Sequence, residues 1–359
     1  MKILVCGAGP TGLAASLFLT ARGHEVRLVE HRTEPTSHSK AFGVNPRTLE
    51  LLEPVGVTER FLANGRRMPA LNLWVRGRRV LRSDLTGVPH RFAFMLVQSQ
   101  ADSERLLAEA LVERGLRIER GLAVERVDVH DGGVCCDLSD GSRAEADVLL
   151  GADGARSKVR EQCGIAFEGA DGQEPWELHD VDLVGDVLNR DEAHVFMLDG
   201  GAMFLVRIRD QTWRVLGNLP GLLDRLPPGL RAGTVHWRSD FGIAQKVAAA
   251  FEHRGRVFLA GDSAHIHAGL GARGMNLGIE DAHVFAELLT QGRLTEYGKL
   301  RRNIVLPLMR RIQRMTDLMR GRSTVARWAR TFVPLVAPVV APLALPAARR
   351  FVLGLDHEV

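Results

Sequence analysis

Residues 261–282 read GDSAHIHAGLGARGMNLGIEDA and follow directly on an apolar stretch, Arg256–Ala260. The apolar stretch predicts a buried strand that ends at Gly261-Asp262, and a glycine-rich turn comes next. The Ala, Leu and Glu residues after the turn predict a helix. Backbone N–H groups converge at the start of such a helix, where the helix dipole favours negative charge. Strand, acid, turn and helix start together predict a site for a ligand with a hydroxylated chain and an electron-rich head.

A second candidate site lies near the start of the chain. Residues 7–12 read GAGPTG between an apolar strand and a predicted helix, and Glu30 ends the next predicted strand. The glycines Gly7, Gly9 and Gly12 permit a tight turn and a close approach of pyrophosphate, while Glu30 can accept hydrogen bonds from ribose hydroxyls. This motif alone does not separate NAD from FAD. Because a second nucleotide-type site follows far along the chain, one long ligand that bridges both is expected, which favours FAD.

A third motif reads DGARSKVR at residues 153–160 and follows a predicted strand, Ala146–Leu150. An acid followed by basic residues at a strand-to-helix turn suits both the FAD phosphates and a reduced nicotinamide cofactor. By itself the segment is equally compatible with an ordinary helix capped at its N-terminus. Asp153 is therefore a candidate cofactor residue because of the two motifs that accompany it.

Local signals between these motifs predict the surrounding elements. Asn45-Pro46 opens a helix that is expected to run to about Gly56, with Asn45 as its N-cap. Ser99 or Gln100 begins another helix, which Gly115 closes. Two strands, Ala123–His130 and Val134–Leu138, are predicted to form a hairpin around an Asp-Gly-Gly turn.

The fold class predicted from these elements is α/β: a Rossmann-like FAD-binding domain with a doubly wound parallel sheet, an inserted substrate domain and C-terminal helices. Longer predicted strands at Ala193–Leu198 and Thr212–Leu219 indicate that the inserted domain is a mostly antiparallel sheet. The reaction site is expected between the two domains. The predicted parts are residues 1–70, 95–165 and 254–290 for the FAD-binding domain, 71–94 and 166–253 for the substrate domain, and 291–359 for the C-terminal helical region.

Composition limits the class of protein and its location. The chain has 359 residues, of which 45% are apolar and 25% charged, as in soluble globular proteins. Lys2 leads directly into an apolar strand, so no signal peptide is expected. The four cysteines have neither metal-ligand spacing nor the pattern of a disulfide framework, which predicts a cytoplasmic protein without a metal site.

The last part of the chain carries the positive charge. Residues 291–359 hold 13 Lys and Arg against four Asp and Glu, and aromatic residues are not interleaved with them, so nucleic-acid binding is not expected. Residues 332–346 are apolar but contain a proline at every fourth position. A membrane-spanning helix needs about 20 unbroken apolar residues. This stretch therefore predicts helical turns that cap the protein, with docking on a membrane surface as the alternative.

The three motifs, in this order, resemble those of the flavin-dependent aromatic monooxygenases of the para-hydroxybenzoate hydroxylase type. The resemblance covers residues 1–160 and 254–290. It implies FAD as cofactor, NADPH or NADH as transient reductant, and hydroxylation of an aromatic or polycyclic small molecule by O2 through a flavin hydroperoxide. Such reactions belong to natural-product biosynthesis or to the modification of drugs and xenobiotics. A monomer or homodimer is expected.

The resemblance also implies roles for individual residues. Gly7, Gly9, Gly12 and Glu30 would hold the ADP half of FAD, Gly261 and Asp262 the ribityl chain, and the helix start at Gly274-Met275-Asn276 would point at the flavin pyrimidine. Further positions that match cofactor contacts are Lys40, Gln100, Arg105, Val124 and Asp153. Plainer alternatives exist, because Gln100 could be a helix cap and Arg105 a salt-bridge partner.

No catalytic base is assigned from the sequence. The candidates for a catalytic role are Arg214, which matches an arginine that abuts the flavin in relatives, His267, and Arg273, which would add positive potential at the flavin. Arg214 could instead be a plain salt-bridge partner. Relatives usually have prolines where this chain has Ala268-Gly269, so the wall beside the oxygen-reacting edge of the flavin is expected to be looser. Two alternatives therefore stay open: a flavoenzyme of the same fold without oxygen insertion, and a flavoprotein that shelters an intermediate without turnover.

Overall fold

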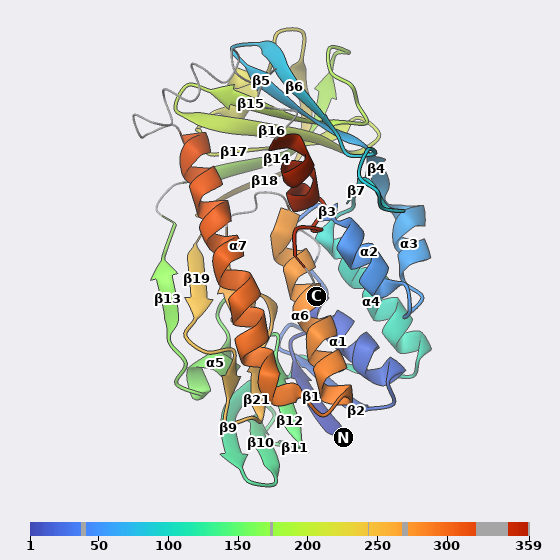
Figure 1. Cartoon of the computed structure of the whole chain (residues 1–359), viewed down its shortest axis with the longest axis vertical. Coiled ribbons are helices and arrows are strands. Elements are labelled where there is room, and N and C mark those ends of the chain that lie inside the picture. Colours follow the sequence, from blue (N-terminus) through green and yellow to red (C-terminus); the bar gives the residue numbers. More distant parts are fainter. Residues whose placement is uncertain (37–40, 173–174, 243, 268–271, 321–343, 358–359) are drawn as a thin grey trace.

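A computed structural model of the chain describes residues 1–36, 41–172, 175–242, 244–267, 272–320 and 344–357. A seven-stranded sheet forms one end of the molecule, and a parallel sheet lies toward the other end (Figure 1). Two long helices, α6 (Arg273–Thr290) and α7 (Tyr297–Arg320), extend from the parallel sheet toward the seven-stranded sheet. The predicted α/β class, with an antiparallel sheet and C-terminal helices, is confirmed.

The parallel sheet has the strand order β20-β21-β12-β1-β2-β8. All neighbours are parallel except the edge pair β20–β21. β1 and β12 are almost continuous apolar runs, because strands covered on both faces need apolar residues at every position. The strands are β1 Lys2–Cys6, β2 Glu25–Glu30, β8 Ile118–Arg120, β12 Val148–Gly151, β20 Glu252–His253 and β21 Val257–Leu259.

Helix α1 (Pro10–Ala21) packs against both α6 and α4 (Gln100–Glu113) beside this sheet. The predicted helix starts are confirmed: the Asn45 side chain accepts a hydrogen bond from the Thr48 N–H at 2.8 Å, and the Ser99 side chain caps α4. The helix after Asn45 ends earlier than predicted, since α2 spans Pro46–Leu52. The remaining short helices are α3 Thr58–Asn64 and α5 Lys158–Gln162, with 3₁₀ turns η1 Leu222–Arg225, η2 Gly261–Ser263 and η4 Leu294–Glu296.

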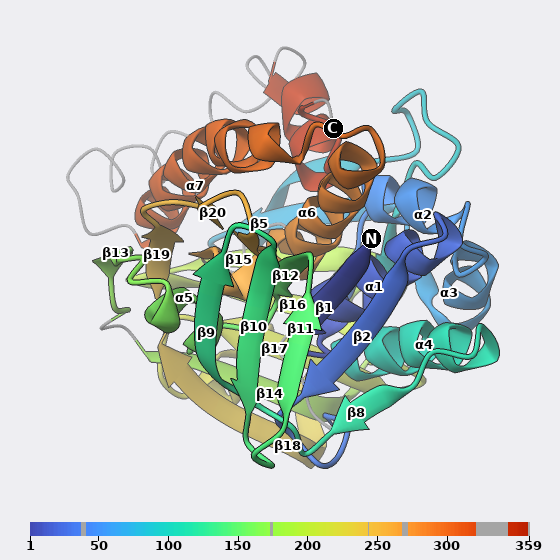
Figure 2. The ribbon, with the colours of Figure 1, turned by 90° about the horizontal axis from the view of Figure 1, so that it is seen from below.

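Three small sheets complete this half of the molecule. The predicted hairpin is confirmed as part of a β11-β10-β9 sheet, which faces the viewer in Figure 2. The other two sheets have the orders β3-β7-β4 and β13-β19-β22. Their strands are β3 Gly43–Val44, β4 Arg66–Met68, β7 Met95–Val97, β9 Val124–His130, β10 Gly133–Leu138, β11 Arg143–Ala146, β13 Phe167–Ala170, β19 Gln245–Ala248 and β22 His265–Ile266.

The seven-stranded sheet has the order β18-β14-β17-β16-β15-β5-β6 and is antiparallel except for the pair β15–β5. One face carries its own apolar cluster, which includes Val181, Met203, Trp213 and Val215. This confirms the predicted mostly antiparallel second sheet, whereas the exact domain boundaries stay a prediction. The strands are β5 Ala70–Val75, β6 Arg78–Asp84, β14 Pro175–Val184, β15 Ala193–Leu198, β16 Gly201–Arg209, β17 Thr212–Gly217 and β18 Arg231–Gly242.

The last described stretch forms a helix over residues 344–352 and then an irregular segment to residue 357. Of the apolar stretch at 332–346, residues 332–343 lie outside the described residues. No helix among the described residues is both long and apolar enough to cross a membrane.

Candidate functional site

The motifs at residues 7–12 and 153–160 meet through their backbones at the ends of β1 and β12. The Ala152 N–H donates to the Cys6 carbonyl at 2.8 Å, immediately before Gly7. Gly7 has φ of +104°, and a Cβ there would stand 2.3 Å from the Ala152 carbonyl oxygen. Only glycine therefore fits at Gly7, because both the conformation and the neighbouring strand exclude a side chain.

The motifs at residues 153–160 and 261–282 are joined by side chains that we did not single out from the sequence. The Ser263 hydroxyl donates to the Gly151 carbonyl at 2.6 Å, and the Arg160 guanidinium donates to the Ser263 carbonyl at 2.9 Å. The same guanidinium lies 3.8 Å from the centroid of the Phe167 ring. In the sequence, the only sign of this contact was the arginine that ends the DGARSKVR motif. In the structure Arg160 is buried and ties that motif to the turn after β21.

The motif at residues 261–282 also meets the motif at residues 7–12, because Gly261 of η2 and Gly278 of α6 let these two elements approach α1. A Cβ on Gly261 would stand 2.4 Å from the Thr11 hydroxyl oxygen, and one on Gly278 would stand 2.2 Å from it. Three motifs that are far apart in the sequence therefore form one continuous backbone cluster.

Two other glycines of the motifs face open space. A Cβ at Gly9 or at Gly274 would meet no atom within 4 Å. Gly9 is the N-cap of α1 and Gly274 lies in the first turn of α6, and the structure gives neither helix a side-chain cap among the described residues. The first N–H groups of both helices are therefore suited to bind an anionic or electron-rich ligand.

Glu30 is bound to the glycine loop itself. One carboxylate oxygen accepts a hydrogen bond from the Ala8 N–H at 2.7 Å. The other accepts from the Arg32 N–H at 2.9 Å and lies 2.9 Å from the His31 ring. The carboxylate thus fixes the loop at the end of β2, where it would also meet the ribose of a dinucleotide.

Asp262 differs from the other acids of the cluster. Its side chain is exposed and makes no hydrogen bond or ion pair with the residues that the structure describes. The protein atoms around it nevertheless raise the pKa of its carboxyl, against a smaller lowering by nearby His265. An accessible acceptor that is surrounded by protein and lacks a protein partner suits the hydroxyls of a ligand chain.

Asp153 binds the first turn of α5, whose N-cap is Ser157, through one of its two carboxylate oxygens. Its Oδ2 accepts from the Val159 N–H at 3.1 Å in α5, as the alternative interpretation expected. Its Oδ1 is buried and finds no hydrogen-bond partner among the described residues. Burial raises the pKa of this carboxyl.

The side chains of Met275 and Asn276 at the start of α6 make contacts within the protein. The Asn276 side-chain oxygen accepts from the Asn45 N–H at 3.0 Å and from the Thr48 hydroxyl at 2.7 Å, and its amide donates to Gly43. Met275 is half-buried and packs against the main hydrophobic core. The group at this helix start that a ligand can reach is therefore the backbone at Gly274, where a Cβ would meet no atom within 4 Å.

Arg273 does not supply free positive potential, contrary to the expectation for this catalytic candidate. Its side chain is buried and lies 3.1 Å from Asp356, which neutralises its charge, and it donates to the Phe351 carbonyl at 3.0 Å. The physical reason is that residues 344–357 pack on this helix start, a long-range contact that no local pattern encodes.

Of the other predicted residues, Val124 and His267 are buried, whereas Gln100 and Arg105 pair with residues of their own helix. Val124 is buried at the start of β9. Gln100 donates to Glu104 at 2.8 Å, and Arg105 pairs with Glu109 at 2.9 Å on the protein surface, as the salt-bridge alternative expected. His267 is buried, with its ring stacked 6.5 Å from that of His265.

Two predicted positions cannot be placed. Lys40 and the Ala268-Gly269 pair lie outside the described residues.

Arg214 lies on the face of the seven-stranded sheet that looks toward the nucleotide-type cluster. It forms two hydrogen bonds of 2.8 Å with Asp180 of the neighbouring strand. Its guanidinium carbon lies 5.8 Å from the Phe42 ring, beside β3, and 5.5 Å from the Trp237 ring. The strand register places Trp237 opposite Asp180 and Phe241 opposite Trp176, so this face is aromatic with one embedded ion pair.

These observations test whether the residues fit FAD. Gly9 and Gly274 leave open space at two adjacent helix starts, and Asp262 offers a carboxylate without a protein partner. Asp153 adds a buried orphan oxygen. The cluster therefore fits a long ligand with phosphates, hydroxyls and an electron-rich ring. No group of three or more His, Cys, Asp or Glu side chains in the described part of the chain could hold a metal ion.

The sequence of this chain matches a known protein family and curated relatives. The FAD binding domain family matches residues 1–206 and 226–304. The 6-methylpretetramide 4-monooxygenase of Streptomyces rimosus is 33% identical over 312 residues, 79% of this chain and 55% of that protein. A rifampicin monooxygenase of Streptomyces venezuelae is 34% identical over 304 residues, 78% of this chain and 62% of that protein.

The chain thus spans little more than half the length of these relatives. Among solved structures, the p-nitrophenol 4-monooxygenase PnpA of Pseudomonas putida is similar with a TM-score of 0.85 at 22% identity, and the match covers 99% of this chain and 98% of that one.

Proposed function

Because this chain belongs to the FAD binding domain family, we propose that it is a monooxygenase that uses FAD, NAD(P)H and O2 to hydroxylate an aromatic or polycyclic small molecule. In this reaction NAD(P)H, O2, a proton and the substrate give NAD(P)⁺, water and the hydroxylated product. The observation that carries the proposal is the exposed and unpartnered Asp262 beside the open helix starts of Gly9 and Gly274. The monooxygenase names of the relatives support the reaction type.

FAD, when bound, would supply the redox and oxygen-activating chemistry. Gly9 and the start of α1 would hold its pyrophosphate, Glu30 its ribose and Asp262 its ribityl hydroxyls. The start of α6 would place a positive helix end against negative charge on the reduced ring. Lys40, Gln100, Arg105 and Val124 remain predicted contacts of the cofactor.

The substrate would lie between the nucleotide-type cluster and the seven-stranded sheet. Trp237 and Phe241 on that face offer flat apolar surfaces for an aromatic ring. The Arg214–Asp180 pair is buried within the same face and orients polar groups there without leaving a net charge. The sheet would also exclude water from the reaction, which FAD chemistry with O2 requires.

One experiment tests the proposal. The purified protein is loaded with FAD, supplied with NADPH or NADH and isotopically labelled O2, and offered a panel of phenols and polycyclic aromatic compounds. A product that carries one labelled oxygen atom supports hydroxylation. Cofactor oxidation with peroxide release for every compound would overturn it in favour of a flavoenzyme without oxygen insertion. FAD binding without any NAD(P)H oxidation would instead favour a protein that shelters an intermediate.

A further inference from the structure

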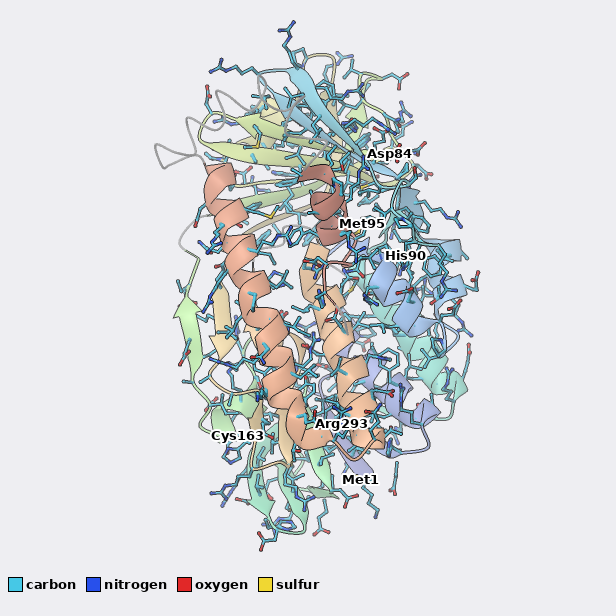
Figure 3. The ribbon with its side chains drawn as sticks, viewed as in Figure 1. Met1, Asp84, His90, Met95, Cys163 and Arg293 are labelled. Atoms are coloured by element: carbon cyan, nitrogen blue, oxygen red, sulfur yellow. The ribbon has the colours of Figure 1, made fainter. Side chains whose placement is uncertain are left out.

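Residues 344–357 pack against the start of α6, the helix that we propose faces the flavin. Leu353 is fully buried and Leu355 nearly so, in a cluster between the seven-stranded sheet and the small sheet of β3, β4 and β7. Figure 3 shows Met95 of this cluster beside the helix of residues 344–352. The other buried members of the cluster are Met68, Leu85, Val88, Val97 and Val206.

Asp356 ties this segment to two helices at once. Its carboxylate lies 3.1 Å from Arg273 in the first turn of α6 and 3.4 Å from Arg311 of α7. Arg273 also donates to the Phe351 carbonyl at 3.0 Å. A buried arginine at the start of α6 therefore finds its counter-charge and a carbonyl partner in this segment.

His357 continues the polar contacts into the interior. Its Nε2 lies 2.7 Å from Glu280, and Glu280 lies 2.8 Å from Arg301. Arg301 donates to Asp281 at 2.7 Å, and Asp281 accepts the Gly261 N–H at 2.9 Å. A chain of ion pairs, completed by one hydrogen bond to a backbone N–H, thus runs from His357 to Gly261, the residue that precedes Asp262.

Burial makes the members of this chain depend on one another. Arg301 and Asp281 have fully buried side chains, and Glu280 and Arg273 are nearly so. Charges in such surroundings interact strongly, and the loss of one leaves its neighbour buried without a partner. A change at Asp356 or His357 is therefore expected to reach the turn that carries Asp262.

We propose that Asp356 and His357 are positioning residues of the cofactor site, which couple the docking of residues 351–357 to the binding of FAD. The proposal rests on FAD as the cofactor. It differs from a merely structural role because coupling is reciprocal: the docked segment would favour FAD, and FAD would favour the docked segment.

The test compares variants of the full chain by titration with FAD, followed through the quenching of flavin fluorescence. Asp356→Asn and His357→Gln are expected to raise the dissociation constant of FAD about fivefold or more. Asp356→Glu keeps the charge and is expected to restore most of the affinity. Arg350→Gln changes an exposed residue of the same segment, and Leu188→Ala weakens a remote cluster on the outer face of the seven-stranded sheet; both should leave the constant unchanged.

Two further measurements separate positioning from general stability. FAD is expected to slow amide hydrogen exchange in residues 344–357 of the wild-type protein. The reduction potential of bound flavin should become more positive in Asp356→Asn, because Arg273 at the start of α6 loses the carboxylate that neutralises it. The coupling would be overturned if Asp356→Asn and His357→Gln both bound FAD as tightly as the wild type. It would also be overturned if FAD did not change the rate of amide hydrogen exchange in residues 344–357.

The outcomes also separate this proposal from the proposed function. Coupling without any hydroxylated product would contradict the function alone, and hydroxylation without coupling would contradict the positioning role alone. A wild-type protein that binds no FAD would overturn both.

Discussion

Asp281 accepts a 2.9 Å hydrogen bond from the backbone N–H of Gly261, although the two residues belong to different elements. The contact fixes the turn after β21, in which the next residue is the exposed Asp262. The same carboxylate binds His265 at 2.6 Å and Arg301 at 2.7 Å. Burial would raise the pKa of Asp281, but its contacts with His265 and Arg301 outweigh the effect of burial and the pKa is lowered.

Asp281→Asn removes the charge at the centre of this contact and keeps the shape. We expect the free energy of unfolding to fall by about 3 kcal/mol, because Arg301 loses a buried counter-charge and His265 loses its carboxylate partner. Denaturant unfolding measures the loss. Glu287→Gln is the matched control, since its pair with Arg22 is half-exposed and should contribute less than about 1 kcal/mol. Equal losses in the two variants would contradict the central position of Asp281.

Asp262→Ala tests the ligand role of the unpartnered carboxylate. We expect the dissociation constant of FAD to rise about 10- to 100-fold, which corresponds to the loss of one or more hydrogen bonds to a charged group. The free energy of unfolding without FAD should stay within about 0.5 kcal/mol of the wild type, because no described residue depends on Asp262. Full retention of FAD would place the ribityl chain elsewhere.

Gly9→Ala and Gly12→Ala form a matched pair. A Cβ at Gly9 meets nothing within 4 Å, so the variant should fold with a stability within about 1 kcal/mol of the wild type but lose FAD, since the methyl group occupies the space for pyrophosphate. A Cβ at Gly12 would stand 1.8 Å from the Gly7 carbonyl oxygen and should cost about 3 kcal/mol or more. Denaturant unfolding and FAD titration of both proteins measure the contrast. If Gly9→Ala binds FAD as well as the wild type, the phosphates do not lie at this turn.

The parts of the site that sequence could predict are those set by local chemistry. A glycine turn between a strand and a helix is encoded within a few residues, and so Gly7, Gly9 and Asp262 are found in one cluster as expected. The partners of Arg273 and Asn276 could not be predicted from such local patterns. Their partners come from residues 351–357 and 43–48, and the helix pattern around them does not reveal which distant segment will pack there. Asp281 was visible in principle, as an acid on the apolar face of a predicted helix.

Ala272→Gly addresses a strained residue at the start of α6. Ala272 has φ of +53°, in the left-handed region where an L-residue other than glycine costs about 1 kcal/mol or more. Glycine removes this strain but gives the unfolded chain more freedom, so we expect a net gain between zero and about 1 kcal/mol. Thermal or denaturant unfolding measures it. Ala282→Gly, within the same helix, should instead lose about 1 kcal/mol. A loss at both positions would show that Ala272 is not strained.

His357 predicts a pH dependence of known sign. Burial would lower its pKa, but its hydrogen bonds to Asp356 and Glu280 outweigh this, and the pKa is raised above the ordinary value of 6.5. Protonated His357 therefore stabilises the folded protein. This contribution is complete below pH 6.5 and is lost as the pH rises through the higher pKa of the folded state.

The comparison of wild type with His357→Gln isolates this contribution. We expect the wild type to be more stable by about 1 to 2 kcal/mol at acidic pH near 6, and the difference to shrink toward alkaline pH. His24 gives a control of opposite sign, because burial and neighbouring positive charges lower its pKa. The difference between wild type and His24→Gln should therefore grow as the pH rises. Denaturant unfolding across this pH range measures both, and a difference at His357 that does not change with pH would mean that its imidazole is not charged in the folded protein.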